Sequence, residues 1–484
     1  MLTQPIDILF FFAVTVPFIG VLESKVKMPY LSGVYSALGM ILSGYAAYEI
    51  LMIVGSGVFE FPIGVESFYA YMRIDALGIY MALVQLTLGI LGTIYSIRYM
   101  ENDSITPLYY SLLLAMMAGM IGIVFAGDLF TLFVFWELLS ITSYILVAWM
   151  RSQWEPIEAG LKYLVMGSIG SVTALFGLSL LYGLTGSLHF TDLSALLSDA
   201  DTSLWFHIIF LMLVTGFGVK AAIVPLHTWL PDAHSAAPSP VSALLSGVVI
   251  ETALYVIIRI TFTVFPQIHL DWTLILAFLS IATMTLGNLT ALLQTDIKRM
   301  LAYSSIGHMG YMLIGLVTGT QIGLTGTFFH FFSHMLMKGT AFLCAGAIIF
   351  RIGTRNLEDM NGIAKRMPIT SVALIVSLFG LIGMPGISGF VGKLILFVST
   401  VDANMIWVGG FLILNSVISA GYYIRVIRAM MQPMSEKVEN VDEAPNSMLF
   451  PIVLMTVLMV FFGLWPDMIL GLIERAVIAL FSIT

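Results

Sequence analysis

Two lysines in this sequence lie close to a proline inside otherwise apolar runs. Lys220 stands five residues before Pro225, and Lys393 stands eight residues after Pro385. Proline removes a backbone donor and clashes with the preceding turn, so a helix should break or kink at each place. A charged group at that depth marks an ion pathway by default. The alternative is two packing kinks whose lysines extend toward the membrane surface.

Glu137 is flanked by apolar residues in FVFWELL and is the natural partner of Lys220. Without a partner, desolvation would keep this carboxyl group protonated, whereas a nearby lysine favours the carboxylate. Such a pair adds little stability, because dehydrating both charges offsets much of their attraction. It suits a switch, since a lysine that leaves its carboxylate gives up a proton more readily.

Three basic groups, His330, His334 and Lys338, stand at positions i, i+4 and i+8. On a helix they share one face and extend over roughly 12 Å of its axis. Histidine titrates near neutral pH, so this stripe could relay protons. Two alternatives stay open: the two histidines could hold a metal ion, or they could be structural residues that bond to neighbouring helices.

Three further polar residues, His227, Asp232 and His234, fall where the chain returns from the Pro225 break toward Pro240. They could line an entrance for ions or merely satisfy irregular backbone. Lys162 falls early in an apolar run, where a transport role and simple extension to the surface are both open.

Composition places all these groups in a membrane protein. The 484 residues are 59% hydrophobic and only 10% charged, whereas soluble domains are about a quarter charged. The net charge of −8 does not suggest nucleic-acid binding, and the one cysteine, Cys344, excludes a disulfide framework or a cysteine metal site. No cofactor motif is present, so partner subunits would have to perform any redox chemistry.

Spanning a bilayer takes about 20 apolar residues. On that criterion residues 1–484 form a single membrane domain of about fourteen transmembrane helices, and residues 466–484 remain as an apolar tail. The expected helices are 5–22, 29–54, 74–97, 108–126, 129–150, 159–184, 204–224, 240–260, 272–293, 300–317, 321–350, 370–401, 405–430 and 448–465. The fold class is therefore an all-α polytopic membrane protein.

The seventh and twelfth of these helices each contain a break and a lysine. Paired interrupted spans are the sequence mark of an inverted-repeat transporter. We therefore expect two inverted five-helix repeats, residues 108–260 (helices four to eight) and 272–430 (helices nine to thirteen), with discontinuous helices seven and twelve.

The basic residues test this topology independently. Loops after even-numbered helices hold only Arg73 and Arg259. Loops after odd-numbered helices hold Lys25, Lys27, Arg98, Arg151, Lys298, Arg299, Arg351, Arg355, Lys365, Arg366, Arg425, Arg428 and Lys437. This positive-inside bias puts the odd-to-even loops in the cytoplasm and both termini outside.

At these residues the sequence resembles the antiporter-like membrane subunits shared by Mrp cation/proton antiporters, respiratory complex I and membrane-bound hydrogenases. The resemblance covers roughly residues 70 to 430. It is carried by GDLFTLFVFWELLS (127–140), PLHTWLPDAH (225–234), APSPVS (237–242), DIKRMLAYSS (296–305), the His334/Lys338 helix and GFVGK (389–393). The motif WLPDAHSAAPSP and the chain length look closest to the D-type protein of the Mrp antiporters and its hydrogenase relatives, and the quinone-proximal subunit of complex I looks less similar.

The resemblance implies fourteen helices in two inverted repeats, with Glu137 and Lys220 as an ion pair, the His330–Lys338 stripe as connector and Lys393 as the lysine of the second channel. One departure concerns Glu251, in VVIETALY, where family members usually carry lysine or histidine. The carboxyl group could relay protons, bind a cation or hold Lys220 in a second ion pair.

The function expected from these residues is that of a proton-translocating, antiporter-like subunit of a multisubunit complex in the cell (inner) membrane of a prokaryote. Its expected partners are other hydrophobic subunits of an antiporter, respiratory or hydrogenase complex, the lipid bilayer, and protons with sodium as a second candidate ion. The rival is a self-sufficient secondary carrier for a small solute, which should contain a central polar cavity instead of a line of titratable groups.

Overall fold

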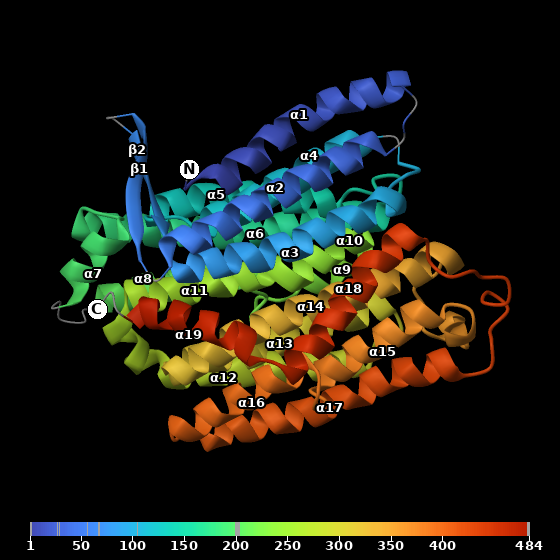
Figure 1. Cartoon of the computed structure of the whole chain (residues 1–484). Helices are drawn as coiled ribbons and strands as arrows, with labels where there is room; N and C mark the ends of the chain where they lie inside the picture. The colour runs from blue at the N-terminus through green and yellow to red at the C-terminus, as the bar shows by residue number, and fades with distance from the viewer. Residues whose placement is uncertain are drawn as a thin grey trace.

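The computed structural model describes residues 2–26, 28, 30–55, 57–65, 68–103, 105–198 and 204–481. Most long helices run roughly along one direction, and a β-hairpin projects at one end of the bundle (Figure 1). We call this the hairpin end and the other the basic end, because Arg98, Arg355 and most other loop lysines and arginines lie there. Within the described residues, twelve helices are long and apolar enough to cross a membrane.

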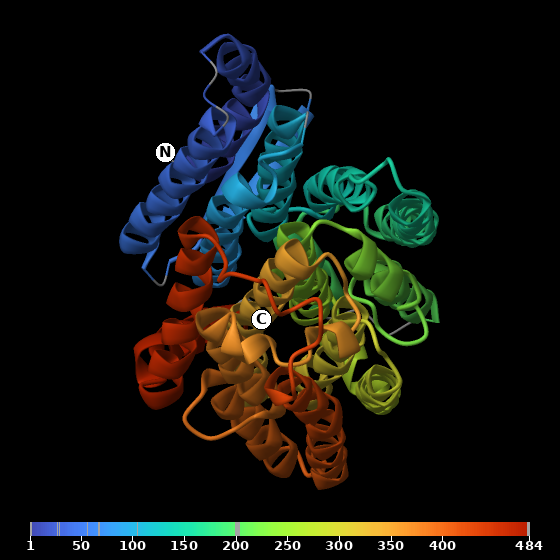
Figure 2. The same cartoon turned by 90° about the vertical axis from the view of Figure 1, so that its right-hand side faces the viewer.

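The first part of the chain forms the side of the bundle drawn in blue and cyan (Figure 2). Its elements are α1 (Gln4–Val26), α2 (Leu31–Val54), β1 (Phe59–Val65), β2 (Phe68–Ile74), α3 (Ala76–Tyr99), α4 (Thr106–Val124), α5 (Leu129–Val147), α6 (Trp154–Thr185) and α7 (Phe190–Ser198). Aspartate side chains start two of these helices: Asp75 accepts from the Gly78 amide at α3, and Asp128 accepts from the Thr131 amide at α5.

The middle of the chain supplies the centre of the bundle. It comprises α8 (Leu204–Lys220), α9 (Trp229–Ala236), α10 (Ser239–Leu244), the π-helical turn η1 (Leu245–Val249), α11 (Ile250–Thr263), α12 (Pro266–Leu292), α13 (Ile297–Thr318) and α14 (Gln321–Ile352). The continuous span α10–η1–α11 is buried along its whole length, whereas α1 and α18 expose many large apolar side chains. Apolar side chains on the outer helices suit contact with lipid.

The last part of the chain first packs on the side opposite α1 and α2 and then returns, with its two final helices, to pack against α3 (Figure 2). It comprises the 3-10 turns η2 (Glu358–Met360) and η3 (Ile363–Lys365), then α15 (Pro368–Ile382), α16 (Ser388–Asp402), α17 (Ile406–Met431), α18 (Asn446–Leu464) and α19 (Asp467–Phe481). The described helices match the expected spans to within a few residues, and the expected interruptions of helices seven and twelve are confirmed.

Both interruptions have a clear local cause. Helix α8 stops at Lys220 itself, and Ala222, with φ 52°, turns the chain away before Pro225. Helix α15 ends at Gly383 with φ 95°, a conformation that favours glycine because it has no Cβ, and α16 begins after Pro385. Each break therefore leaves helix-end backbone groups inside the bundle.

The structure differs from the sequence expectation in two elements. The connection between α2 and α3 folds into the antiparallel hairpin β1–β2, so the protein is nearly all helical rather than entirely so. The hairpin is held by backbone bonds from Arg73 N to Phe125 O (2.8 Å) and from Gly127 N to Tyr71 O (2.7 Å). The apolar tail forms a helix, α19, which packs against α3 and α14.

Candidate functional site

Lys220 lies at the last turn of α8 and is 2% exposed. Its Nζ donates to the Tyr163 hydroxyl at 3.3 Å and lies over the rings of Trp136, Tyr144 and Tyr163 at 5.2 to 5.4 Å from their centroids. These aromatic faces stabilise a cation through their quadrupoles where water is excluded. The lysine is thus held in an aromatic cage from α5 and α6.

Glu137 lies beside this cage on α5, one residue after Trp136. It is half-buried, and its Oε1 atom has no hydrogen-bond partner. Among the described ion pairs, none joins Glu137 to Lys220 within 4 Å. The two groups are neighbours across the α5–α8 region but are not in contact in this conformation, in which Lys220 is bonded to Tyr163 instead.

Glu251 is fully buried on α11 and is paired with His334 of α14. The distance from His334 Nδ1 to Glu251 Oε1 is 2.7 Å, and neither side chain has any exposed surface. The second carboxylate oxygen, Oε2, has no hydrogen-bond partner among the described residues. Glu251 therefore contacts the histidine stripe, and the described ion pairs include none between Glu251 and Lys220.

The stripe residues on α14 all contact neighbouring helices. His330 Nε2 lies 3.0 Å from Nδ1 of His308 on α13, and the two rings stack with centroids 5.3 Å apart. The His308 ring is also 5.0 Å from that of His334. His308 thus joins His330 and His334, which bond to different helices, into one cluster of three buried imidazoles.

Lys338 ends the stripe toward the basic end. Its Nζ donates to Leu301 O at 2.9 Å and to the Ser304 hydroxyl, both on α13. The side chain is fully buried. Its contacts within the described chain are neutral oxygens, so it brings an uncompensated cation or a neutral amine into the bundle.

Lys393 lies on α16 against the broken end of α15. Its Nζ donates to the carbonyls of Leu381 (2.8 Å) and Ile382 (3.0 Å) and to the Ser416 hydroxyl at 3.2 Å. Carbonyls at a helix C-terminus are left without intrahelical partners and carry partial negative charge, so they suit an ammonium group. The same Nζ lies 4.6 Å from the Tyr311 ring centroid.

Lys393 and the histidine cluster are neighbours. Gly392 lies so close to His330 that an added Cβ would stand 2.7 Å from Nδ1 of that ring. Tyr311, which contacts Lys393, also meets His308 edge-on at 5.2 Å between centroids. A contiguous group therefore extends from Glu251 through three histidines to the break in the second half of the chain.

The three candidate entrance residues do not act as one group. Asp232 forms ion pairs at the molecular surface with Lys162 and with Arg299, each at 2.9 Å. His227 is half-buried in the α8–α9 connection. His234 is fully buried, stacks on Phe342, and has no side-chain hydrogen bond within the described chain.

Lys162 is the exception among the lysines that fall inside expected spans. Its side chain is 50% exposed and pairs with Glu158 and Asp232 at 2.9 Å each. It therefore extends to the surface, the simpler of its two alternatives.

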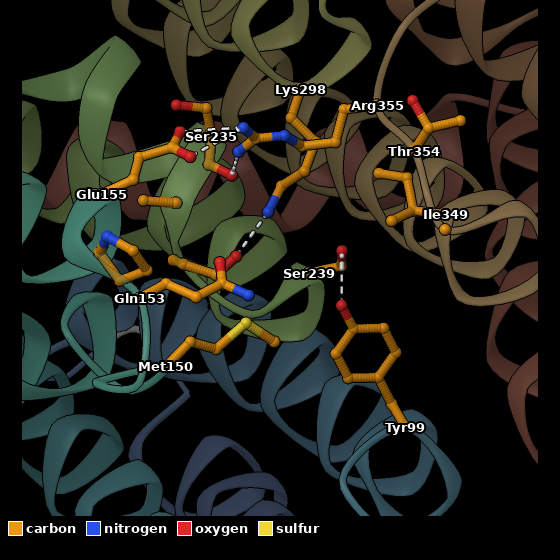
Figure 3. A pocket seen from close by; sticks show the side chains of 14 residues that line it. Tyr99, Met150, Gln153, Glu155, Ser235, Ser239, Lys298, Ile349, Thr354 and Arg355 are labelled. Atoms are coloured by element: carbon orange, nitrogen blue, oxygen red, sulfur yellow. Dashed lines mark hydrogen bonds and ion pairs between the residues drawn. The ribbon is translucent and has the colours of Figure 1, made fainter. Parts of the chain in front are cut away.

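A polar pocket with a volume of about 370 Å³ lies at the basic end, and residues 235–237, which directly follow His234 in the chain, form part of its lining (Figure 3). Lys298, which is 3% exposed, reaches into it and donates to Ala237 O, and Arg355 bonds Ser235 O and Glu155 at its rim. On the other wall Tyr99 meets the Ser239 hydroxyl at 3.3 Å. Sequence reasoning assigned Lys298 to a cytoplasmic loop, because the expected helix began at residue 300. In the structure α13 begins at Ile297 and therefore includes Lys298.

His308 was another site residue missed by sequence reasoning. It is the only histidine in the expected helix 300–317, and no lysine, aspartate or glutamate stands at helical spacing to draw attention to it. Its importance comes from the packing of α13 on α14, which a single-helix pattern does not contain.

Residues 126–419 match the family described as NADH:quinone oxidoreductase/Mrp antiporter, TM. The chain belongs to this family. The resemblance inferred from the sequence motifs is thereby confirmed.

Two relatives show how far the similarity of this antiporter-family chain extends. It is 33% identical over 434 residues to F(420)H(2) dehydrogenase subunit N of Methanosarcina mazei, covering 87% of each chain. It is 33% identical over 423 residues to NADH-quinone oxidoreductase subunit N of Heliobacterium modesticaldum, covering 87% of this chain and 89% of the relative. Both relatives are N-type subunits of redox enzymes. The sequence motifs, in contrast, had looked closest to the D-type Mrp protein.

A solved structure supports the fold. A chain in the structure of the Mrp complex from Dietzia sp. DQ12-45-1b superposes with a TM-score of 0.89, at 24% identity, over 99% of this chain and 98% of that one. The antiporter-family chain thus has the same multi-pass membrane fold as that chain.

Proposed function

We propose that this chain translocates protons as the antiporter-like subunit of a larger membrane complex, either an Mrp-type cation/proton antiporter or the ion-pumping part of a hydrogenase or complex I-like oxidoreductase. Its relatives are named as subunits of two redox enzymes, and its fold is that of a chain in an Mrp complex. Partner subunits would supply redox chemistry where there is any. Sodium is the second candidate ion.

The single observation that carries this proposal is the contiguous group of buried titratable side chains. Glu251, His334, His308 and His330 lie within contact of one another, and Lys393 borders the group through Tyr311. Charges inside a membrane protein are costly and are kept where ions pass. A purely structural bundle would not need five such groups side by side.

Lys220 and Glu137 form the second part of the route. We propose that Lys220 alternates between the aromatic cage, where it lies in this structure, and Glu137, whose Oε1 atom is buried and free of hydrogen bonds. Moving the ammonium group toward the carboxylate stabilises its charge, and moving it away favours release of the proton. The pair would therefore act as a switch.

The entrance of the route is proposed at the pocket shown in Figure 3. It lies at the basic end, which the positive-inside pattern assigns to the cytoplasm, and it is lined by polar groups around Lys298. Lys298 bonds the carbonyl of Ala237, three residues from His234. Among the three expected entrance residues, we therefore retain His234 as part of the entrance. With the basic end in the cytoplasm, both termini would lie outside.

The breaks at Lys220 and Lys393 also support the division into two inverted repeats, residues 108–260 and 272–430. In each proposed repeat a lysine stands at an interrupted span and within contact of tyrosine. Inverted repeats place their broken helices at corresponding positions near the middle of the bilayer.

The test is Lys220→Ala in the assembled complex, reconstituted into vesicles with a pH-sensitive dye. We expect proton translocation to fall by about a hundredfold, the lower range for losing a positioned proton-transfer group. Lys162→Ala is the matched control, because that lysine is exposed and paired at the surface. Proton transport at the wild-type rate in Lys220→Ala, with normal assembly, would contradict the proposed function.

A further inference from the structure

Arg73 and Arg259 are the two basic residues that the positive-inside pattern leaves at the hairpin end, and both are buried in one ion-pair network. Arg259 Nη2 bonds Asp75 Oδ2, with side chains 2% and 1% exposed. Arg73 Nε lies 3.4 Å from the same oxygen, and Arg73 Nη1 bonds Glu60 Oε1 at 2.8 Å. Glu60, 26% exposed, brings this network to the surface.

The network connects to Glu251 along one helix. Glu251, Tyr255 and Arg259 stand at successive i, i+4 positions of α11, where side chains are neighbours. The guanidinium carbon of Arg259 lies 5.8 Å from the Tyr255 ring centroid. The distance along the helix axis from Glu251 to Arg259 is roughly 12 Å. The row therefore covers the part of the continuous span α10–η1–α11 that is nearer the hairpin end.

Buried polar atoms along this row lack partners within the described chain. They are Glu251 Oε2 at its inner end and Arg259 Nη1 and Thr263 Oγ1 at its outer end. Such atoms are rare in native structures and commonly face water or an ion. A buried ion pair is also weak as a device for stability alone, because apolar residues of similar size often serve equally well.

We propose that the Asp75–Arg259 ion pair is the outer gate of the proton route, and that protons leaving Glu251 reach the surface past this pair through Asp75 and Glu60. The proposal rests on the proposed function. The guanidinium group stays protonated under all physiological conditions, so Arg259 repels protons and Asp75 is the member of the pair that accepts one. A proton on Asp75 removes the attraction, and the pair opens.

The chain offers a matched pair of variants for this gate. Asp75→Asn keeps a good helix cap for α3 but loses the charge. Asp128→Asn makes the same change at the cap of α5, where the carboxylate also bonds the hairpin at the Tyr71 amide (2.9 Å) but has no arginine partner. Both caps lie at the hairpin end, so they differ chiefly in the ion pair.

The experiment measures passive proton leak through the assembled complex in vesicles under a potassium diffusion potential, without turnover. We expect Asp75→Asn to leak several-fold faster than the wild type, Asp128→Asn to remain tight, and Arg259→Lys to remain tight because it keeps the charge. The double variant Asp75→Asn, Arg259→Gln, which loses both charges, should leak as Asp75→Asn does.

Two outcomes overturn the gate. One is a proton leak no faster than that of the wild type in Asp75→Asn. Where that variant does not assemble, the same result in the double variant overturns the gate. The other is an equal leak in Asp128→Asn, which would assign the effect to a loosened hairpin. The leak is measured without turnover, so its result is separate from the proposed function. Wild-type vesicles that move no protons during turnover would contradict the proposed function. The leak assay alone tests the gate.

Discussion

At the scale of single residues, the Glu251–His334 contact shows which side chain lies next to the Glu251 carboxyl group in this structure. A carboxylate and an imidazole 2.7 Å apart share one proton across a short bond, and the pair is ionic or neutral according to which atom holds it. In a fully buried site the neutral form avoids the cost of two dehydrated charges. A carboxyl group can therefore stand where the family resemblance implies a lysine or histidine and still pass a proton to its neighbour.

This view predicts the effect of Glu251→Gln. The amide keeps the volume of the side chain but can no longer accept a proton, so translocation should fall by about a hundredfold. Thr252→Val is the control: it breaks the buried bond from Gln85 to Thr252 (2.8 Å) at the same level of the bundle without removing a titratable group. Proton flux into vesicles measures both, and flux at the wild-type level in Glu251→Gln would exclude the relay.

Sequence reasoning reached some of these residues and not their partners. Lys220 was identified because a lysine before a proline in an apolar run is costly anywhere except at a functional break. Its partner in this conformation, Tyr163, was not identified, because a tyrosine in an apolar helix has no distinctive spacing. Which helix faces which depends on tertiary packing, and a pattern along one helix does not contain that information.

At the scale of elements, the break after α8 is stabilised by side chains from elsewhere. Trp229 Nε1 donates to Val219 O at 2.7 Å, and the Val224 amide donates to Thr283 Oγ1 at 3.1 Å. The Trp229 ring stacks on Tyr163, with centroids 3.9 Å apart and planes 4° from parallel. Backbone groups freed by the break thus find partners, as irregular backbone inside a membrane requires.

We predict that Trp229→Phe weakens this break. The ring can still stack on Tyr163, but the Val219 carbonyl loses its donor, which costs about 1–3 kcal/mol for a buried group. Thermal unfolding of the complex should shift down and proton transport should decrease, since Lys220 adjoins Val219. Trp272→Phe is the control, as its Nε1 bonds His207 near the surface. Equal effects of the two variants on unfolding temperature and proton transport would contradict the role of the Trp229 bond at the break.

The two elements that sequence reasoning missed were missed for different reasons. The hairpin lies in a short connection between α2 and α3, where strand pairing depends on contacts with Phe125 and Gly127 far along the chain. Helix α19 is only 15 residues long and contains Glu474 and Arg475, so it fell below the length and hydropathy expected of a span. Twelve of the fourteen expected spans are described helices long and apolar enough to cross a membrane, because a long apolar run in lipid has little choice but to form a helix. The other two are the interrupted spans, which contain α8 and the pair α15 and α16.

At the scale of the whole molecule, charge is distributed unevenly between the two ends. The basic end carries the pocket with Lys298 and Arg355, whereas the hairpin end has Arg73 and Arg259 buried against carboxylates. Exposed lysines and arginines resist transfer across the membrane, and this asymmetry sets orientation. The proposed entrance and the proposed gate would then face opposite sides of the membrane.

The single cysteine makes this orientation testable. Cys344 is fully buried and should not react with a membrane-impermeant thiol reagent, so the wild type serves as the blank. Val58, before β1, is 42% exposed at the hairpin end, and Ser152 is exposed at the basic end. In intact cells Val58→Cys should be labelled and Ser152→Cys should be labelled only after the membrane is opened. The reverse pattern would place the basic end outside and would require protons to enter from the hairpin end.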